Sequence, residues 1–209
     1  MNADVLTSAA VAVIAVVGLA ATIVGIASLL RFAIRLFSVP GVIVHEFAHK
    51  WACGLVGVTV LEVVYFRFGD PPGYVRHVQP DRYREAFVVS VAPFLVNTGS
   101  AFCLFLGLAA LLETTGGIRS ATNGQLAIAV VLCWFALSIG MYAFPSTGDA
   151  NSLWNRSRTE WRRSPTVLLG VPVVVVIYVA NLLSRLWADA LYALGIGVAA
   201  FSVVGPTVI

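Results

Sequence analysis

The most restrictive feature of this sequence is a series of apolar runs that are long enough to cross a lipid bilayer. A spanning helix needs about 20 predominantly apolar residues. Of the 209 residues 59% are apolar and only 11% are charged, against roughly 25% charged residues in a soluble domain. The sequence therefore predicts an α-helical integral membrane protein with about six transmembrane helices. The predicted spans are residues 5–30, 37–58, 86–112, 126–145, 166–183 and 186–204.

These spans predict one membrane-embedded domain over residues 1–209. Its core covers about residues 37–154, and the peripheral spans lie within residues 5–30 and 166–206. The first run is too long for the apolar core of a signal peptide, which has about 7 to 15 residues. No repeat or low-complexity tract indicates an accessory domain. The last two spans are separated by neither Gly nor Pro, so five spans remain an alternative.

Arginines in the loops between the predicted spans indicate an orientation. Cytoplasmic loops are enriched in basic residues, and with six spans eight arginines fall on one side and four on the other. The sequence thus predicts a multi-pass protein of the cell membrane with both termini in the cytoplasm. Because these arginines flank apolar spans, nucleic acid is not an expected partner. The larger group is Arg67, Arg76, Arg82, Arg84, Arg156, Arg158, Arg162 and Arg163, and the smaller is Arg31, Arg35, Arg119 and Arg185.

One short interval between the second and third spans is typical of a β-hairpin. Residues 58–68 are rich in β-branched and aromatic side chains, residues 69–73 are rich in Gly and Pro, and residues 74–78 can form a returning strand. An open strand edge cannot face lipid. The hairpin is therefore expected at the membrane interface or inside the protein, and a plain surface connector is the alternative.

The strongest chemical signal is the segment His45-Glu46-Phe47-Ala48-His49 in the second span. Ionisable side chains at membrane depth are costly and usually functional. Helical residues four apart share a face, so His45 and His49 can bind one metal ion while Glu46 reaches the water on that ion. Zinc lowers the pKa of its bound water towards 7, and a neighbouring carboxylate accepts the proton. We therefore predict one catalytic Zn²⁺ bound by both histidines, with Glu46 as the general base.

A catalytic zinc normally has three protein ligands, so a third must come from elsewhere in the chain. Asp149 is favoured because Pro145 and Gly148 interrupt the end of the fourth span, and broken backbone at membrane depth is tolerated where it lines a cavity. The alternative is that Asp149 only caps a helix. A fourth span that continues to Trp154 would bring Asp149 to the depth of His49. The other candidates are Glu62, Asp70, His77 and Asp189.

Asn97 is an uncommon polar residue in the apolar third span, near a kink expected at Pro93. Its amide has two candidate roles. It can bind the substrate backbone or a developing oxyanion, or it can form a hydrogen bond between helices.

The motif in an early span, the hairpin and the later Pro-containing aspartate segment together resemble the site-2 protease family of intramembrane zinc metalloproteases. The similarity covers about residues 40–151 and corresponds to a minimal core without a PDZ or other accessory domain. The family's aspartate usually lies between leucine and glycine, whereas Asp149 lies between Gly148 and Ala150.

This resemblance implies that Asp149 is the third zinc ligand and that the substrates are transmembrane segments of other proteins. It also implies that the hairpin holds an unwound substrate as an added strand. The residues expected to contact that strand are Val60, Glu62, Val64 and Phe66.

The sequence thus predicts a zinc-dependent intramembrane endopeptidase whose partners are a transmembrane protein substrate and the lipid bilayer. The alternative is a metal-binding membrane transporter or sensor without hydrolytic activity. A transporter would need a continuous polar pathway, and the other predicted spans contain few ionisable residues.

Overall fold

The computed structural model of this chain describes residues 3–162 and 165–204. The chain divides into two compact units, Met1–Phe37 and Ser38–Ile209. Residues 205 and 206, at the end of the last predicted peripheral segment, lie outside the described residues.

The described chain is mostly helical, with one small two-stranded sheet. Both features confirm the prediction of a helical fold with a short hairpin after the second apolar segment. Two 3₁₀ turns, Pro165–Gly170 and Ser184–Leu186, flank the fifth helix. The α-helices are α1 (Ala3–Val56), α2 (Tyr83–Thr114), α3 (Asn123–Met141), α4 (Thr147–Glu160), α5 (Val171–Leu183) and α6 (Ala188–Val204).

Three helical segments are long and apolar enough to cross a membrane, namely Val11–Val56, Tyr83–Thr114 and Asn123–Met141. A fourth is added if α5 and α6, which meet at an angle of 106°, count as one bent span. The division into six spans therefore stays a prediction.

The first two predicted spans belong to one continuous helix, α1. The expected interruption near Arg31 and Arg35 is absent, because arginine is a good helix former and no Gly or Pro lies between the two apolar runs. Pro40 is the proline inside this helix.

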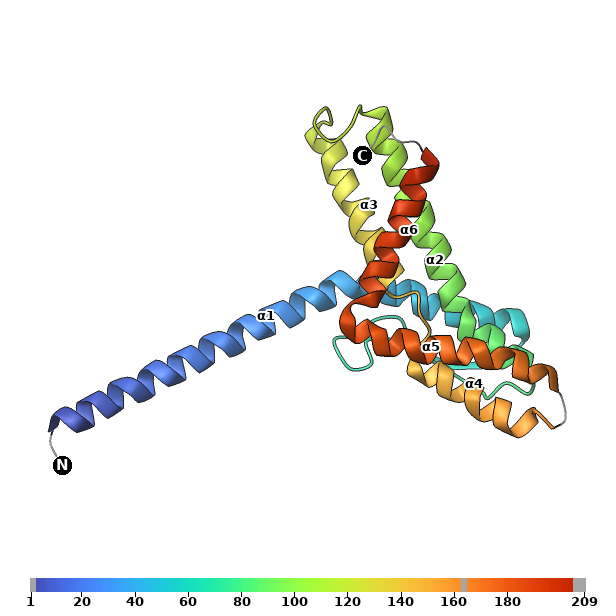
Figure 1. The fold of residues 1–209 in the computed structure, drawn as a ribbon, viewed down its shortest axis with the longest axis horizontal. Helices are drawn as coiled ribbons and strands as arrows, with labels where there is room; N and C mark the ends of the chain where they lie inside the picture. Colours follow the sequence, from blue (N-terminus) through green and yellow to red (C-terminus); the bar gives the residue numbers. More distant parts are fainter. Residues whose placement is uncertain (1–2, 163–164, 205–209) are drawn as a thin grey trace. The chain divides into compact units, whose positions relative to one another are not determined.

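The two larger groups of packed side chains in the second unit both include α2. One group joins α2, α3 and α6, which run side by side, and the other joins α2 to α4 and α5 (Figure 1). The first contains Ala101, Phe105, Leu108, Leu112, Ala136, Ile139, Ile196 and Ala200. The second contains Ala86, Ala150, Leu153, Val174 and Ile177.

Helix α1 approaches α3 very closely at Gly41. The Gly41 N–H donates to Ser138 Oγ over 3.0 Å. A Cβ atom added at Gly41 would lie 2.3 Å from the Ser138 carbonyl oxygen and 2.8 Å from Tyr142 Cδ2. Only glycine permits this approach, which brings His45, one helical turn further on, beside the chain at Tyr142.

The hairpin consists of β1 (Val60–Val64) and β2 (Tyr74–His77), which pair antiparallel with an irregularity between Val60 and Glu62. Both strands are shorter than predicted. Phe66 lies beyond the end of β1, so its assignment to the strand is wrong: the chain is already turning there, and the Arg67 N–H bonds the Pro72 carbonyl over 2.7 Å. The start of the hairpin is anchored because Val60 packs on a buried cluster from α1 and α2, formed by Ala52, Cys53, Val89 and Ala92.

We expect Gly41→Ala to destabilise the protein by about 1–3 kcal/mol, the usual cost of overpacking, even though alanine is the better helix former. The measurement is denaturant unfolding in detergent micelles, followed by circular dichroism. Gly54→Ala is the matched control in the same helix, because a Cβ atom there meets nothing within 4 Å, and it should be neutral or slightly stabilising. Equal stability of the two variants would contradict the close contact between α1 and α3.

Candidate metal centre

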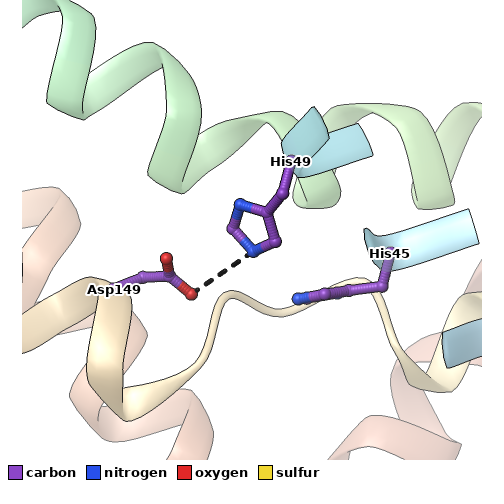
Figure 2. Close-up of side chains that lie close together, drawn as sticks. All are labelled: His45, His49 and Asp149. Atoms are coloured by element: carbon purple, nitrogen blue, oxygen red, sulfur yellow. Dashed lines mark ion pairs between the residues drawn. The ribbon is translucent and has the colours of Figure 1, made fainter. Parts of the chain in front are cut away.

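Three side chains that can bind a metal ion converge in the second unit. His45 and His49 come from α1, and Asp149 comes from the first turn of α4 (Figure 2). Their ligand atoms all lie within 4.8 Å of one another, and His49 Nε2 is 3.6 Å from Asp149 Oδ2. Within the described residues this is the one group of three or more such side chains. The predicted pairing of the two histidines on one helix face is confirmed.

Each imidazole is oriented by a backbone carbonyl. His45 Nδ1 lies 2.8 Å from the Tyr142 oxygen, and His49 Nδ1 lies 2.9 Å from the Val89 oxygen. A carbonyl oxygen only accepts, so both Nδ1 atoms carry the hydrogen and each neutral ring keeps its lone pair on Nε2. This is the usual arrangement of a metal-binding histidine and its supporting partner.

Asp149 is fixed by the capping box that begins α4. Its Oδ2 atom accepts from the Ser146 N–H over 2.9 Å and from the Ser146 hydroxyl over 2.6 Å, while the Asp149 N–H donates to Ser146 Oγ over 3.2 Å. The same Oδ2 atom faces His49. The two roles considered for Asp149 therefore coincide, since the carboxylate caps α4 and also lies in the candidate metal group.

The chain reaches this position through a break rather than through a longer helix. Helix α3 ends at Met141 and α4 begins at Thr147, so the interruption expected near Pro145 is confirmed, and no single helix continues to Trp154. The break occurs where Pro145 cannot donate to a preceding carbonyl.

Helix α5 supports this break through a residue that sequence reasoning did not select. Asn181 Nδ2 donates to the Pro145 carbonyl over 2.8 Å and to its own helix at the Ile177 carbonyl. Its signal in the sequence is a lone amide within an apolar run. The supporting carbonyls of Tyr142 and Val89 were also missed, because side-chain chemistry does not identify them.

Glu46 is buried beside these ligands, with 8% of its surface exposed, as are His45 and His49. The hairpin loop lies against it. A Cβ atom added at Gly73 would lie 2.8 Å from Glu46 Cγ and 2.8 Å from Val42 Cγ1. Glycine at position 73 therefore lets the backbone of the hairpin pack directly against Glu46.

The donor set and one measured separation between ligand atoms fit a zinc ion. With zinc bonds of 2.0–2.2 Å, two ligands of a tetrahedral ion are about 3.4 Å apart, close to the 3.6 Å between His49 Nε2 and Asp149 Oδ2. Two imidazoles and one carboxylate are a donor set of catalytic zinc sites that leave a position open for water.

The four other candidate ligands lie outside this group. Glu62 accepts from the Tyr74 hydroxyl and from Arg76, both over 2.9 Å, and its hydrogen bond raises the pKa of Tyr74. His77 Nδ1 faces the Val78 carbonyl, Asp189 Oδ1 accepts from the Ala190 N–H, and Asp70 is an exposed residue of the hairpin loop.

Asn97 is fully buried and connects three parts of the chain. Its Nδ2 atom donates to the carbonyls of Tyr142 over 3.0 Å, Ile139 over 3.2 Å and Gly41 over 3.3 Å. Its Oδ1 atom is buried and has no hydrogen-bond partner among the described residues. Of the two roles considered, the interhelical one is visible in these contacts. Because the Tyr142 carbonyl also binds His45, Asn97 supports the orientation of that imidazole.

Comparison of the chain with protein-family models, curated proteins and solved structures found no match. The function has to be inferred from the chemistry of the site itself.

We expect Asn97→Ala to weaken zinc binding by about 10-fold, since loss of an outer partner of a metal ligand typically costs 10- to 100-fold and Asn97 acts through a further carbonyl. Competition with a chromophoric chelator measures the affinity. Thr98→Val is the matched control, because it removes another interhelical hydrogen bond from α2, that between Thr98 and the Tyr192 hydroxyl. Equal losses in both variants would indicate general destabilisation and contradict a specific link to His45.

Proposed function

We propose that this chain is a zinc-dependent intramembrane endopeptidase that hydrolyses peptide bonds in or near transmembrane segments of other proteins. The observation that carries this proposal is the convergence of His45, His49 and Asp149 beside the buried carboxylate of Glu46. The histidines and Glu46 belong to a helix that is apolar and long enough to cross a membrane.

Each residue of the group has a distinct task in this reaction. His45 and His49 present Nε2 lone pairs, and Asp149 adds a negatively charged oxygen, so these three would hold the ion. When bound, zinc acidifies a water molecule and polarises the scissile carbonyl. Glu46 accepts the proton of the attacking water and returns it to the leaving amine.

The buried Glu46 favours an enzyme over a metal transporter or sensor. A transporter requires ligands that bind and release the ion, and the three-residue group provides them without Glu46. A carboxylate kept beside the ligands but outside the ligand set has a clear use in hydrolysis, where it acts as the base.

The hairpin is the proposed site for holding the substrate. A helical substrate hides its peptide bonds, so it must unwind before water can attack, and an unwound segment can pair with a strand edge. The contact between Gly73 and Glu46 supports this role, because it brings the hairpin loop to the base. Of the residues proposed to line the substrate strand, Val60, Glu62 and Val64 lie in β1.

The proposed location is the cell membrane, with several spans and both termini in the cytoplasm. Three helices of spanning length support a membrane location. The orientation assumes the six predicted spans, for which eight of the twelve loop arginines fall on the cytoplasmic side.

The decisive variant is Glu46→Gln, which keeps the size of the side chain but removes the base. We expect zinc content to remain stoichiometric while cleavage of a membrane-embedded reporter falls by about 10²- to 10⁴-fold, the usual contribution of a general base. Elemental analysis and gel-based cleavage in proteoliposomes measure the two quantities.

His49→Ala is the paired control and should lose both zinc and cleavage. The proposal fails if the wild type contains zinc, cleaves none of a panel of transmembrane substrates and instead moves metal into vesicles.

A second variant tests the hairpin. Gly73→Ala should lower kcat by about 10- to 100-fold, because displacement of a catalytic group by about 1 Å costs up to 10²-fold, while zinc affinity stays within about 2-fold. Gly54→Ala, with open space around its added methyl group, should retain full turnover. Normal turnover of Gly73→Ala would show that the loop does not position Glu46.

A further inference from the structure

The carbonyl that orients His49 lies four residues before a proline. In an α-helix the carbonyl of residue i accepts from the N–H of residue i+4. For Val89 in α2 that residue is Pro93, which has no N–H and whose ring pushes the carbonyl aside. The Val89 oxygen instead lies 2.9 Å from His49 Nδ1 on α1.

The carbonyl that orients His45, at the end of α3, likewise has no helical N–H to accept from. Tyr142 follows the last residue of the helix, and the residue three positions later is Pro145, which again has no N–H. The residue four positions later, Ser146, gives its N–H to Asp149 Oδ2 over 2.9 Å. The Tyr142 oxygen is thus left for His45 Nδ1 and Asn97 Nδ2.

We propose that Pro93 is a positioning residue of the metal centre, because its missing N–H leaves the Val89 carbonyl available to His49. This bond holds the hydrogen on Nδ1 and turns Nε2 towards the ion. The proposal rests on the zinc site described above, and it assigns to Pro93 a role beyond the kink that the sequence predicts.

A restored N–H at position 93 would compete directly with His49. It would draw the Val89 carbonyl back along the axis of α2, and His49 would lose the partner that fixes its ring and its tautomer. Pro93 is fully buried in the interior of α2, where proline is strongly unfavourable to a helix. Removing this proline therefore separates its effect on the helix from its effect on the metal centre, because helix stability and metal affinity should change in opposite directions.

The test is Pro93→Ala in the full-length protein. Thermal unfolding of the metal-free form should show equal or higher stability, because alanine is the best helix former. Zinc affinity should fall by about 10- to 100-fold, the usual effect of removing a supporting partner. Pro172→Ala, in the first turn of α5 where proline is well tolerated, is the matched control and should bind zinc as the wild type does.

Nitrogen NMR of the histidines gives a second readout that does not depend on metal. The chain contains three histidines, so their signals can be assigned by substitution. In the metal-free wild type at alkaline pH, His49 should be the Nδ1–H tautomer, and Pro93→Ala should shift it towards the Nε2–H tautomer. An unchanged tautomer would overturn the proposal.

An ester bond in place of the peptide bond before residue 93 distinguishes the effect of the missing N–H from the effect of the proline ring. Lactic acid in place of Pro93 removes the ring but supplies no N–H, so zinc affinity should stay within about 3-fold of the wild type, unlike the 10- to 100-fold loss expected for alanine. If the ester weakens binding as much as alanine does, the ring is what matters and the proposal fails.

These outcomes are distinct from a failure of the proposed function. If the wild type binds zinc and Pro93→Ala binds it equally well, the role of Pro93 is refuted and the zinc site stands. If the wild type itself binds no zinc, the proposed function fails.

Discussion

The hydrogen bond between His45 Nδ1 and the Tyr142 carbonyl joins α1 to the break between α3 and α4, and the arrangement of the site depends on this junction. It forms only because Gly41 lets α1 approach α3 without a clash. The chain then reaches Ser146 and begins α4 with the capping box that holds Asp149 beside His49. Asn97 binds the same Tyr142 carbonyl from α2, so three helices converge on one backbone oxygen.

In this apolar chain, backbone carbonyls at interrupted helices serve as hydrogen-bond partners for the buried histidines. A regular helix satisfies its own N–H and C=O groups and leaves no partner for a buried histidine. Two interruptions provide such partners, because Val89 lies four residues before Pro93 in α2 and Tyr142 follows the last residue of α3. Each leaves one carbonyl for one imidazole, and the beginning of α4 orients the carboxylate.

The hairpin packs against the candidate metal centre at a position where only glycine fits. Gly73 rests against Glu46 and Val42, while Val60 at the other end of the hairpin packs on α1 and α2. Lys50 adds a hydrogen bond of 3.0 Å to the Tyr65 hydroxyl in the connecting loop. The hairpin is therefore held against the segment that carries the histidines at several points.

The sequence by itself determined the features that depend on local spacing. These are the helical fold, the hairpin, and the common face of His45 and His49, because residues four apart on a helix are neighbours whatever surrounds them. Tertiary structure decided how Asp149 reaches His49 and which carbonyls orient the rings, because these contacts join residues 40 to about 100 positions apart in the chain. It also merged the first two predicted spans into one helix and ended β1 before Phe66. Local patterns do not encode where a helix stops relative to a distant neighbour, since packing between helices sets that position.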